Sequence, residues 1–392
     1  MNRLFTPRFF IMCGFSFAVF LAALQLLPAA PFHILDLGGT TFQSGLFLAF
    51  LTYASACSAP LTGALGDRLG RRRVMITAAV VMTALSMAYG VITSIPLLLA
   101  VALVHGVFWS SLLAATGAYM VSGVIPETRR AEGIGYWGLS SVIALAVAPP
   151  IGFWVYRFGW LWLCLGCAAL NFTMAMIAWK LLDDAGQIVA AHPVTHPRDL
   201  VDVRALVLSV TMFLCTFGYG AVTSFSALFA ESQAIVPKSI FLTAMALAIL
   251  VCRPLVGARA DRIGYKKVLV PALGLDFLGL AILSATAGRA GMIAGALTFG
   301  AGFGILWPVF SAYLLQGVDP ARRGAMYGAM LAAVDTGIGT GSMSTGWLID
   351  RAGFSLSFGV GAAVAALAIP YFLLIDRVHE ARHRHRAKNE GR

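Results

Sequence analysis

The sequence has few charged residues for its length. Only 11% of its 392 residues are Asp, Glu, Lys or Arg, whereas 59% are hydrophobic. Because a soluble domain usually carries about 25% charged residues, this composition excludes an ordinary water-soluble protein. Lipid is therefore the solvent that we expect around most of the chain.

Signatures of enzymes and of ATP-driven proteins are also missing. The chain has no glycine-rich phosphate-binding loop, which argues against direct use of ATP. The apolar runs hold no set of nucleophile, base and metal ligands, which argues against a membrane-embedded enzyme. His192 and His196 each precede a proline in a polar segment, a poorly organised arrangement for a metal. We therefore expect no cofactor and no bound metal.

Long apolar runs are what the sequence does contain. They lack two-residue alternation and are too long for strands, so they predict an all-α integral membrane protein. Twelve runs are found, six in each half of the chain. Their approximate bounds are 8–30, 42–65, 74–93, 97–122, 132–156, 160–181, 204–229, 238–260, 267–287, 290–316, 324–350 and 353–375.

The two halves of the chain resemble each other at a constant offset of 194 residues. This offset carries Pro60 onto Pro254 and Gly159 onto Gly353. A repeat of this length indicates two similar halves and not a solenoid of short units. We expect a first six-helix bundle (1–182), a cytoplasmic linker (183–203), a second six-helix bundle (204–376) and a basic cytoplasmic tail (377–392).

The basic residues predict the orientation in the membrane. If the N-terminus lies inside, 23 of the 28 Lys and Arg residues fall on the inner side and four on the outer side. Such an asymmetry predicts that both termini are cytoplasmic. It also accounts for the net charge of +11 without a nucleic-acid partner.

A repeated loop pattern carries most of the functional information. It lies between the second and third apolar runs and again between the eighth and ninth. Its residues are Gly63, Asp67, Arg68, Gly70 and Arg71 in the first half, and Gly257, Asp261, Arg262 and Gly264 in the second. Glycine permits close helix approach and tight turns, and an aspartate is attracted to the N-terminus of a facing helix. These properties predict contacts that gate the inner side.

This loop pattern resembles the signature of the major facilitator superfamily. The resemblance covers essentially the whole chain, by span count and by repeat. It implies two six-helix bundles that rock around a central substrate site, with alternating access. Pro149 and Pro150 in the fifth run resemble the proline segment of proton-coupled exporters, with Ala148 in place of the usual first glycine. They predict a kink in that helix.

Two further segments are similar to one branch of bacterial efflux permeases. They run from 126 to 138 and from 335 to 342. That branch includes drug, sugar-efflux and metallophore exporters, among them drug/proton antiporters. The resemblance implies a location in a bacterial inner membrane. The chain departs from many drug/proton exporters at Ala102, where those carry an arginine in the fourth span. Proton coupling through such an arginine is therefore not available here.

Ionisable residues inside the spans are functional candidates because burying them is costly. Asp335 lies near the midplane of the eleventh run, and His105 is the titratable residue of the fourth. Both are candidates for proton coupling, with hydrogen-bonded packing roles as the alternative. Arg253 and Asp276 lie at similar depths, and we expect them to form a buried ion pair.

The resemblance also implies which helices line the substrate site. The first, fourth, seventh and tenth spans offer aromatic, hydroxyl and amide groups without an acid, which suits a small apolar or amphipathic solute. The candidates are Gln25, Trp109, Ser110, Tyr219, Thr223 and Trp307. We expect a monomeric secondary active transporter that exports such a solute with protons. An importer or facilitator of a sugar, an organic acid or another metabolite remains the alternative.

Overall fold

The computed structural model describes residues 4–181, 203–316, 318 and 323–390, and this part of the chain is helical without a strand. The helices of the first half are α1 (Pro7–Asp36), α2 (Thr41–Leu69), α3 (Arg71–Val91), α4 (Ile95–Tyr119), η1 (Met120–Val124), η2 (Glu127–Arg129), α5 (Arg130–Tyr156) and α6 (Trp160–Leu181). Those of the second half are α7 (Val203–Ser232), α8 (Ile240–Ile263), α9 (Tyr265–Ala285), α10 (Gly288–Leu315) and α11 (Arg323–Glu390).

Short local signals start and end these helices. Thr6 caps α1 by accepting a hydrogen bond from the Phe9 amide. Thr40 and Gln43 form a capping box at the start of α2, in which each side chain accepts from the other residue's amide. Both arrangements satisfy amides that have no partner inside the helix.

Glycines with positive φ separate helices that would otherwise be continuous. Gly70 (φ 88°) divides α2 from α3, and Gly264 (φ 93°) divides α8 from α9. Gly353 (φ 77°, ψ 177°) interrupts α11, so that α11 consists of two helical parts. Its counterpart at the offset of 194 residues, Gly159, also has a positive φ of 114° and precedes α6. Only glycine adopts this conformation at little cost.

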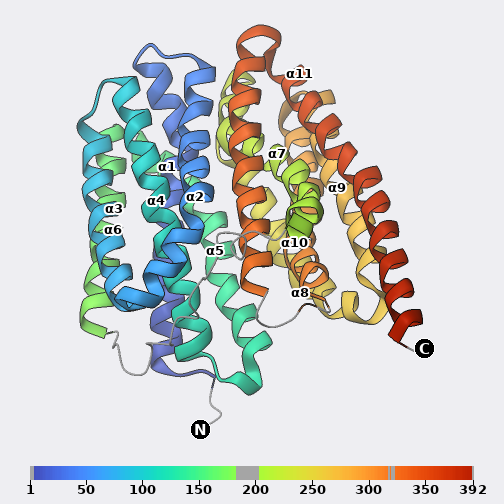
Figure 1. Ribbon diagram of the computed structural model, residues 1–392. Coiled ribbons are helices and arrows are strands. Elements are labelled where there is room, and N and C mark those ends of the chain that lie inside the picture. Colours follow the sequence, from blue (N-terminus) through green and yellow to red (C-terminus); the bar gives the residue numbers. More distant parts are fainter. Residues whose placement is uncertain (1–3, 182–202, 317, 319–322, 391–392) are drawn as a thin grey trace.

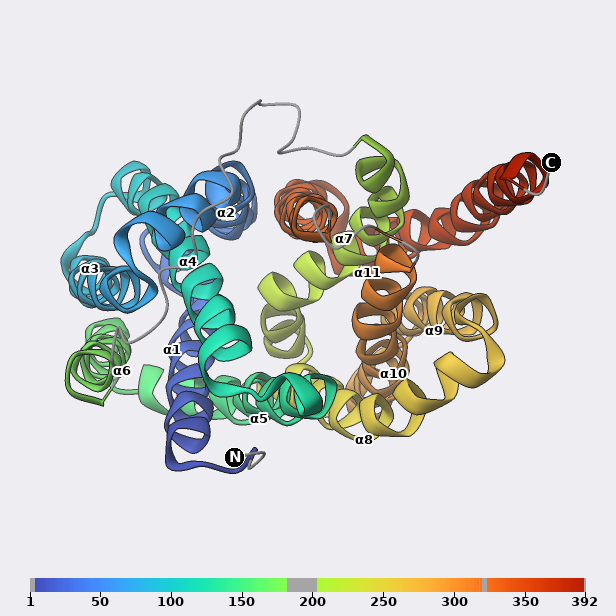
Figure 2. The same ribbon diagram turned by 60° about the horizontal axis from the view of Figure 1, so that its bottom comes forward.

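The helices form two groups that lie side by side (Figure 1). The first group, α1 to α6, is blue to green, and the second, α7 to α11, is yellow-green to red. In the first group α1 packs on α5, α2 on α4 and α3 on α6, and in the second α7 packs on α11, α8 on α10 and α9 on α11. The groups meet where α2 contacts α11 and where α5 contacts α8, as the view of Figure 2 also shows.

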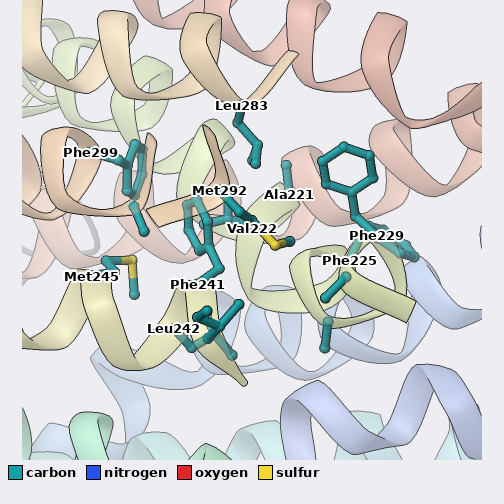
Figure 3. Close-up of a cluster of buried hydrophobic side chains, with 14 of the residues drawn as sticks. Ala221, Val222, Phe225, Phe229, Phe241, Leu242, Met245, Leu283, Met292 and Phe299 are labelled. Carbon is teal, nitrogen blue, oxygen red and sulfur yellow. The ribbon is translucent and has the colours of Figure 1, made fainter. Parts of the chain in front are cut away.

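Clusters of buried apolar side chains hold each group together. One cluster of the second group is shown in Figure 3, with Phe225 of α7, Phe241 of α8, Leu283 of α9 and Phe299 of α10. Phe32 of α1 belongs to the same cluster, so this apolar core also contacts the first group.

The predicted helical spans agree with the helices in type and position. In the described part of the chain, ten helices are long and apolar enough to cross a membrane. One of them, Met326–Asp376, includes the break at Gly353, and the apolar part of α8, Ile240–Pro254, is shorter than a full span. The linker expected at 183–203 lies almost entirely outside the described residues, and so do the side chains of the tail.

Candidate functional site

A line of hydrogen bonds joins α2 to the first part of α11. At its end, the Asp350 carboxylate accepts from the Thr41 amide (3.2 Å), the Thr41 hydroxyl (2.5 Å) and the Phe42 amide (3.0 Å). The Thr41 hydroxyl also lies 2.8 Å from the carbonyl oxygen of Gly346. Together with the Thr40 and Gln43 capping box, Asp350 satisfies the first turn of α2, where a negative charge is favoured by the helix dipole.

The same line continues toward the middle of both helices. The buried Ser342 hydroxyl donates to the carbonyl oxygen of Gly45 (3.0 Å) and contacts the Ser224 hydroxyl of α7 (2.7 Å). The Tyr53 and Thr340 hydroxyls are 2.9 Å apart. These contacts require small residues, because a side chain at Gly45 would collide with the backbone of Ser342. We call the stretch from Thr41 to Ser55, with its partners on α11, the α2–α11 seam.

Asp335 lies at the end of the seam that is near the middle of α2. Its partly buried carboxylate lies close to the buried Ser55 hydroxyl of α2. Three glycines follow on the same helix. Gly337 and Gly341 approach the backbone of α7, and Gly339 approaches Thr52 and Tyr53 of α2. The proton-coupling candidate of the second half therefore contacts the first half directly.

The other proton-coupling candidate, His105, lies inside the first group of helices. It is only 3% exposed, and its Nδ1 atom is 3.2 Å from the Tyr89 hydroxyl of α3. Its Nε2 atom has no hydrogen-bond partner among the described residues. His105 thus has no direct contact with Asp335 and belongs to a different environment.

The repeated loop pattern is only partly described. The backbone of Gly63 and Asp67 belongs to α2, and that of Gly257 and Asp261 belongs to α8. The surroundings of the two glycines and the side chains of the two aspartates lie outside what the structure describes. Arg68 and Arg262 are exposed. Gly70 and Gly264 occupy the predicted turns.

Arg71 has a different environment from the exposed arginines of the pattern. It is buried, and its guanidinium donates to the carbonyl oxygen of Ala118 (3.0 Å) and to the Ser122 hydroxyl. Because Ser122 belongs to the π-helix that follows α4, Arg71 holds the start of α3 against the end of α4.

The six substrate-site candidates are distributed over α1, α4, α7 and α10. Gln25 is buried against Gly152 of α5, and Ser110 contacts the Thr62 hydroxyl of α2 at 3.1 Å. Trp109 packs edge-on against Phe20 at 5.6 Å between ring centroids. Ser110 is therefore engaged in helix packing.

The second group contributes the other three candidates. Tyr219 of α7 stacks on Phe303 of α10, with centroids 4.5 Å apart and planes 10° apart. Thr223 is buried with its hydroxyl unpartnered among the described residues. Trp307 is partly buried beside the apolar cluster of α7, α9 and α10. Among the candidates, the partly buried Tyr219 thus forms a flat aromatic pair with Phe303, which is itself partly buried.

The expected ion pair between Arg253 and Asp276 is wrong. Asp276 is fully buried on α9 against Gly302 of α10, and neither carboxylate oxygen has a hydrogen-bond partner among the described residues. Arg253 points toward α5 instead. Its guanidinium would lie 3.9 Å from a Cβ atom added at Gly138. The two residues lie at similar depths, but the helix faces that carry them do not meet. Their positions in the sequence do not reveal how each helix is rotated.

The prolines of the fifth run lie inside α5, which continues from Arg130 to Tyr156. Pro149 is buried and Pro150 is half-buried. Gly152, one turn further on, packs against the backbone of Gln25. The proline segment thus belongs to the α1–α5 contact, and its kink stays a prediction.

Sequence reasoning missed Asp350, which accepts three hydrogen bonds across the contact between the two groups. Thr40 and Gln43 form a recognisable helix-start pattern, but nothing in the sequence links that pattern to an aspartate 309 residues away. The described residues contain no group of three or more His, Cys, Asp or Glu side chains arranged for a metal.

Comparison with known proteins places the chain among transporters. A family model described as the Major Facilitator Superfamily matches residues 9–236 and 208–391. The "Uncharacterized MFS-type transporter YhhS" of Escherichia coli K12 is 22% identical over 363 residues, 91% of this chain and 89% of that protein. Its counterpart in Salmonella typhimurium is 23% identical over 365 residues, with the same coverage.

Solved structures show the same fold. The nucleoside transporter NupG matches with a TM-score of 0.74 at 14% identity, covering 94% of this chain and 99% of its own. The human organic anion transporter MFSD10 matches with a TM-score of 0.67 at 17% identity, covering 94% of this chain and 100% of its own. From the family match over nearly its whole length, the chain is a member of the Major Facilitator Superfamily.

Proposed function

We propose that this protein is a proton-driven exporter of a small apolar or amphipathic organic solute, working by alternating access. Two bundles, 1–182 and 204–376, form twelve spans if the two parts of α11 are separate spans. The protein acts as a monomer in a bacterial inner membrane, with both termini and the 183–203 segment in the cytoplasm. Membership in the superfamily supports secondary transport, and the positive-inside bias supports this orientation.

The α2–α11 seam is the observation that carries the alternating-access mechanism. Its polar contacts fall between Thr41 and Ser55, in the first half of α2. At the same end of the molecule, Lys238 lies over the ring of Phe32, 4.6 Å from its centroid. In the proposed orientation this end faces outward, so these contacts close the outer side and must separate when the solute leaves.

The repeated loop pattern is the proposed counterpart of this closure on the inner side. There, Asp67 and Asp261 would face helix ends of the opposite bundle when the inner side closes. The exposed positions of Arg68 and Arg262 suit contacts with anionic headgroups or with the opposite bundle. Gly63 and Gly257 would allow the close helix approach that this closure needs.

Asp335 is the proposed proton carrier. It lies in the seam, where its protonation changes the electrostatic contact with Ser55 of the other bundle. A protonated carboxyl group is less costly to move through an apolar helix interface than a carboxylate. Proton uptake at Asp335 from the outer side therefore favours burial of the residue and closure of the seam, and release of the proton to the inner side completes its exchange for the solute. His105, with its hydrogen bond to Tyr89, has a secondary influence at most.

Uptake of a nucleoside or a similar metabolite is the second candidate function. The stacked pair Tyr219 and Phe303 offers a flat aromatic face on α7 and α10, a suitable surface for a planar ring. The fold likeness to a nucleoside transporter raises the same possibility. The efflux-like segments of the sequence favour export instead. An enzyme embedded in the membrane remains the least supported alternative.

Transport by the purified protein in sealed vesicles separates these candidates. Inside-out and right-side-out vesicles are given a pH gradient and a panel of labelled amphipathic drugs, sugars, organic acids and nucleosides. Export predicts accumulation inside inside-out vesicles with an acidic interior, and loss of accumulation when a protonophore collapses the gradient. Accumulation in right-side-out vesicles alone, or equal downhill movement without the gradient, would establish uptake or facilitation and reject the proposal.

A further inference from the structure

A small polar cavity lies inside the first group of helices, away from the α2–α11 seam. Residues of α1, α3, α4 and α6 enclose it, and its volume is about 10 Å³. Its polar or sulfur-containing side chains are Met82, Ser86, His105, Cys167 and Asn171, and the remaining wall, from α1, is apolar. A volume of this size holds about one water molecule, provided that polar partners surround it.

His105 supplies an unpaired donor to this cavity. The Tyr89 hydroxyl is buried, and its described hydrogen bond is the one to Nδ1 of His105. A buried tyrosine hydroxyl needs an acceptor for its single proton, so Nδ1 accepts and the ring proton lies on Nε2. This Nε2 atom has no protein partner among the described residues, which is costly for a buried donor.

Asn171 and Ser86 supply the complementary groups. The Asn171 side-chain nitrogen donates to the Ser86 hydroxyl at 3.0 Å and, more weakly, to the carbonyl oxygen of Met82 at 3.4 Å. Both protons of this amide are thereby used, which leaves its oxygen as an acceptor for the cavity. Ser86 accepts from Asn171 and still has its own proton to donate.

The equivalent positions of the second half have no such polar groups. At the offset of 194 residues, Ser86 corresponds to Leu280, His105 to Phe299 and Asn171 to Ala365. All three belong to the apolar cluster of Figure 3, in which Phe299 and Leu283, the counterpart of Tyr89, are labelled. That core is filled by side chains, so the polar cavity is specific to the first half.

We propose that this cavity is a binding site for one structural water molecule. The water accepts hydrogen bonds from Nε2 of His105 and from the Ser86 hydroxyl, and donates to the Asn171 side-chain oxygen. It thereby links α3, α4 and α6, and it gives His105 a structural role as a neutral ring. A metal cation does not fit, because Nε2 carries the ring proton and the Cys167 thiol donates to the carbonyl oxygen of Ala22 at 3.3 Å.

X-ray radiolysis of the purified full-length protein tests this site without a transport assay. Radiolysis turns a bound water into hydroxyl radicals, which oxidise neighbouring sulfur side chains. We expect rapid oxidation of Met82 and Cys167, measured by peptide mass spectrometry, although they are 4% and 1% exposed. Met212 and Cys215, both 0% exposed in an apolar cluster, are the internal controls and should stay unoxidised.

Two variants connect the oxidation to the proposed partners. His105→Phe copies the residue of the second half and removes the donor, and Ser86→Leu fills the cavity from another helix. Either variant that folds should lower oxidation of Met82 and Cys167 to the level of the controls. His33→Phe is the control. It changes a histidine that stacks on Trp160 and does not line the cavity, so Met82 and Cys167 should still be oxidised rapidly in this variant.

Two results would overturn the inference. The first is oxidation of Met82 and Cys167 in the natural protein as slow as that of Met212 and Cys215, which means a dry cavity. The second is one equivalent of bound metal by elemental analysis that disappears in His105→Phe, which means a metal site instead of a water site.

Discussion

The carboxylate of Asp350 caps the helix that Thr41 begins, although 309 residues separate the two in the sequence. The two amides and the one hydroxyl that donate hydrogen bonds to this carboxylate belong to the first turn of α2. An acidic group in this position is favourable because of the unpaired amides and the dipole of the helix. Here the cap comes from the other half of the molecule, so it joins the two halves as well as stabilising a helix.

Removing this cap should shift the protein toward a state with an open seam. Asp350→Ala loses an N-terminal cap worth about 1 kcal/mol, which changes the ratio of two conformations about five-fold. Spin labels at Phe42 and Trp347 should show more of the longer distances in pulsed electron paramagnetic resonance.

Asp36→Ala is the matched control for this change. Asp36 also lies at this end of the molecule, but it accepts from the Tyr156 hydroxyl at 2.6 Å within the first half. Its loss should leave the label distances unchanged. The same distance distribution in Asp350→Ala and the natural protein would show that the cap does not hold the seam.

Asp335→Asn should abolish proton-driven accumulation while sparing substrate binding and downhill exchange. The amide keeps the size of the side chain and its contact with Ser55, but it cannot carry a proton. Accumulation and counterflow are measured in the same vesicles.

Ser55→Ala, which removes the partner and keeps the carboxyl group, should reduce accumulation only partly. His105→Ala should affect the pH profile less than Asp335→Asn. Full accumulation by Asp335→Asn would assign the residue a packing role.

Gly106→Val and Gly300→Val should both destabilise the fold. A side chain at Gly106 would collide with the carbonyl oxygen of Leu51, and one at Gly300 with that of Met245. Because a backbone atom cannot rotate away, overpacking should cost at least about 1–3 kcal/mol. Thermal unfolding followed by size-exclusion chromatography measures the loss. Gly166→Val, with nothing within 4 Å of the added carbon, is the control. Unchanged stability in both test variants would mean that these helix crossings adapt.

A thiol at Gln187 should be inaccessible from outside intact cells. The positive-inside bias predicts that this segment is cytoplasmic. An impermeant maleimide should label a Gln187→Cys variant only after the cells are lysed, and Lys238→Cys, on the proposed outer side, is the positive control. Labelling of Gln187→Cys in intact cells would reject the orientation.

The helical membrane fold and many of its boundaries could be predicted from the amino-acid sequence. Long apolar runs leave backbone groups without water, so each run must satisfy them as a helix. Gly70 and Gly264 mark turns because a positive φ suits glycine. Each of these inferences depends on local chemistry.

The pairs of polar groups that contact each other, in contrast, are visible only in the folded protein. Arg253 and Asp276 are matched in charge and depth, yet they lie on faces that do not meet, whereas Asp350 and Thr41 contact each other across the two halves. The sixth-helix residue Asn171 completes a cavity around His105 of the fourth helix. Which helix faces meet depends on helix rotation and crossing, which many small packing contacts set together. No short stretch of sequence contains that information.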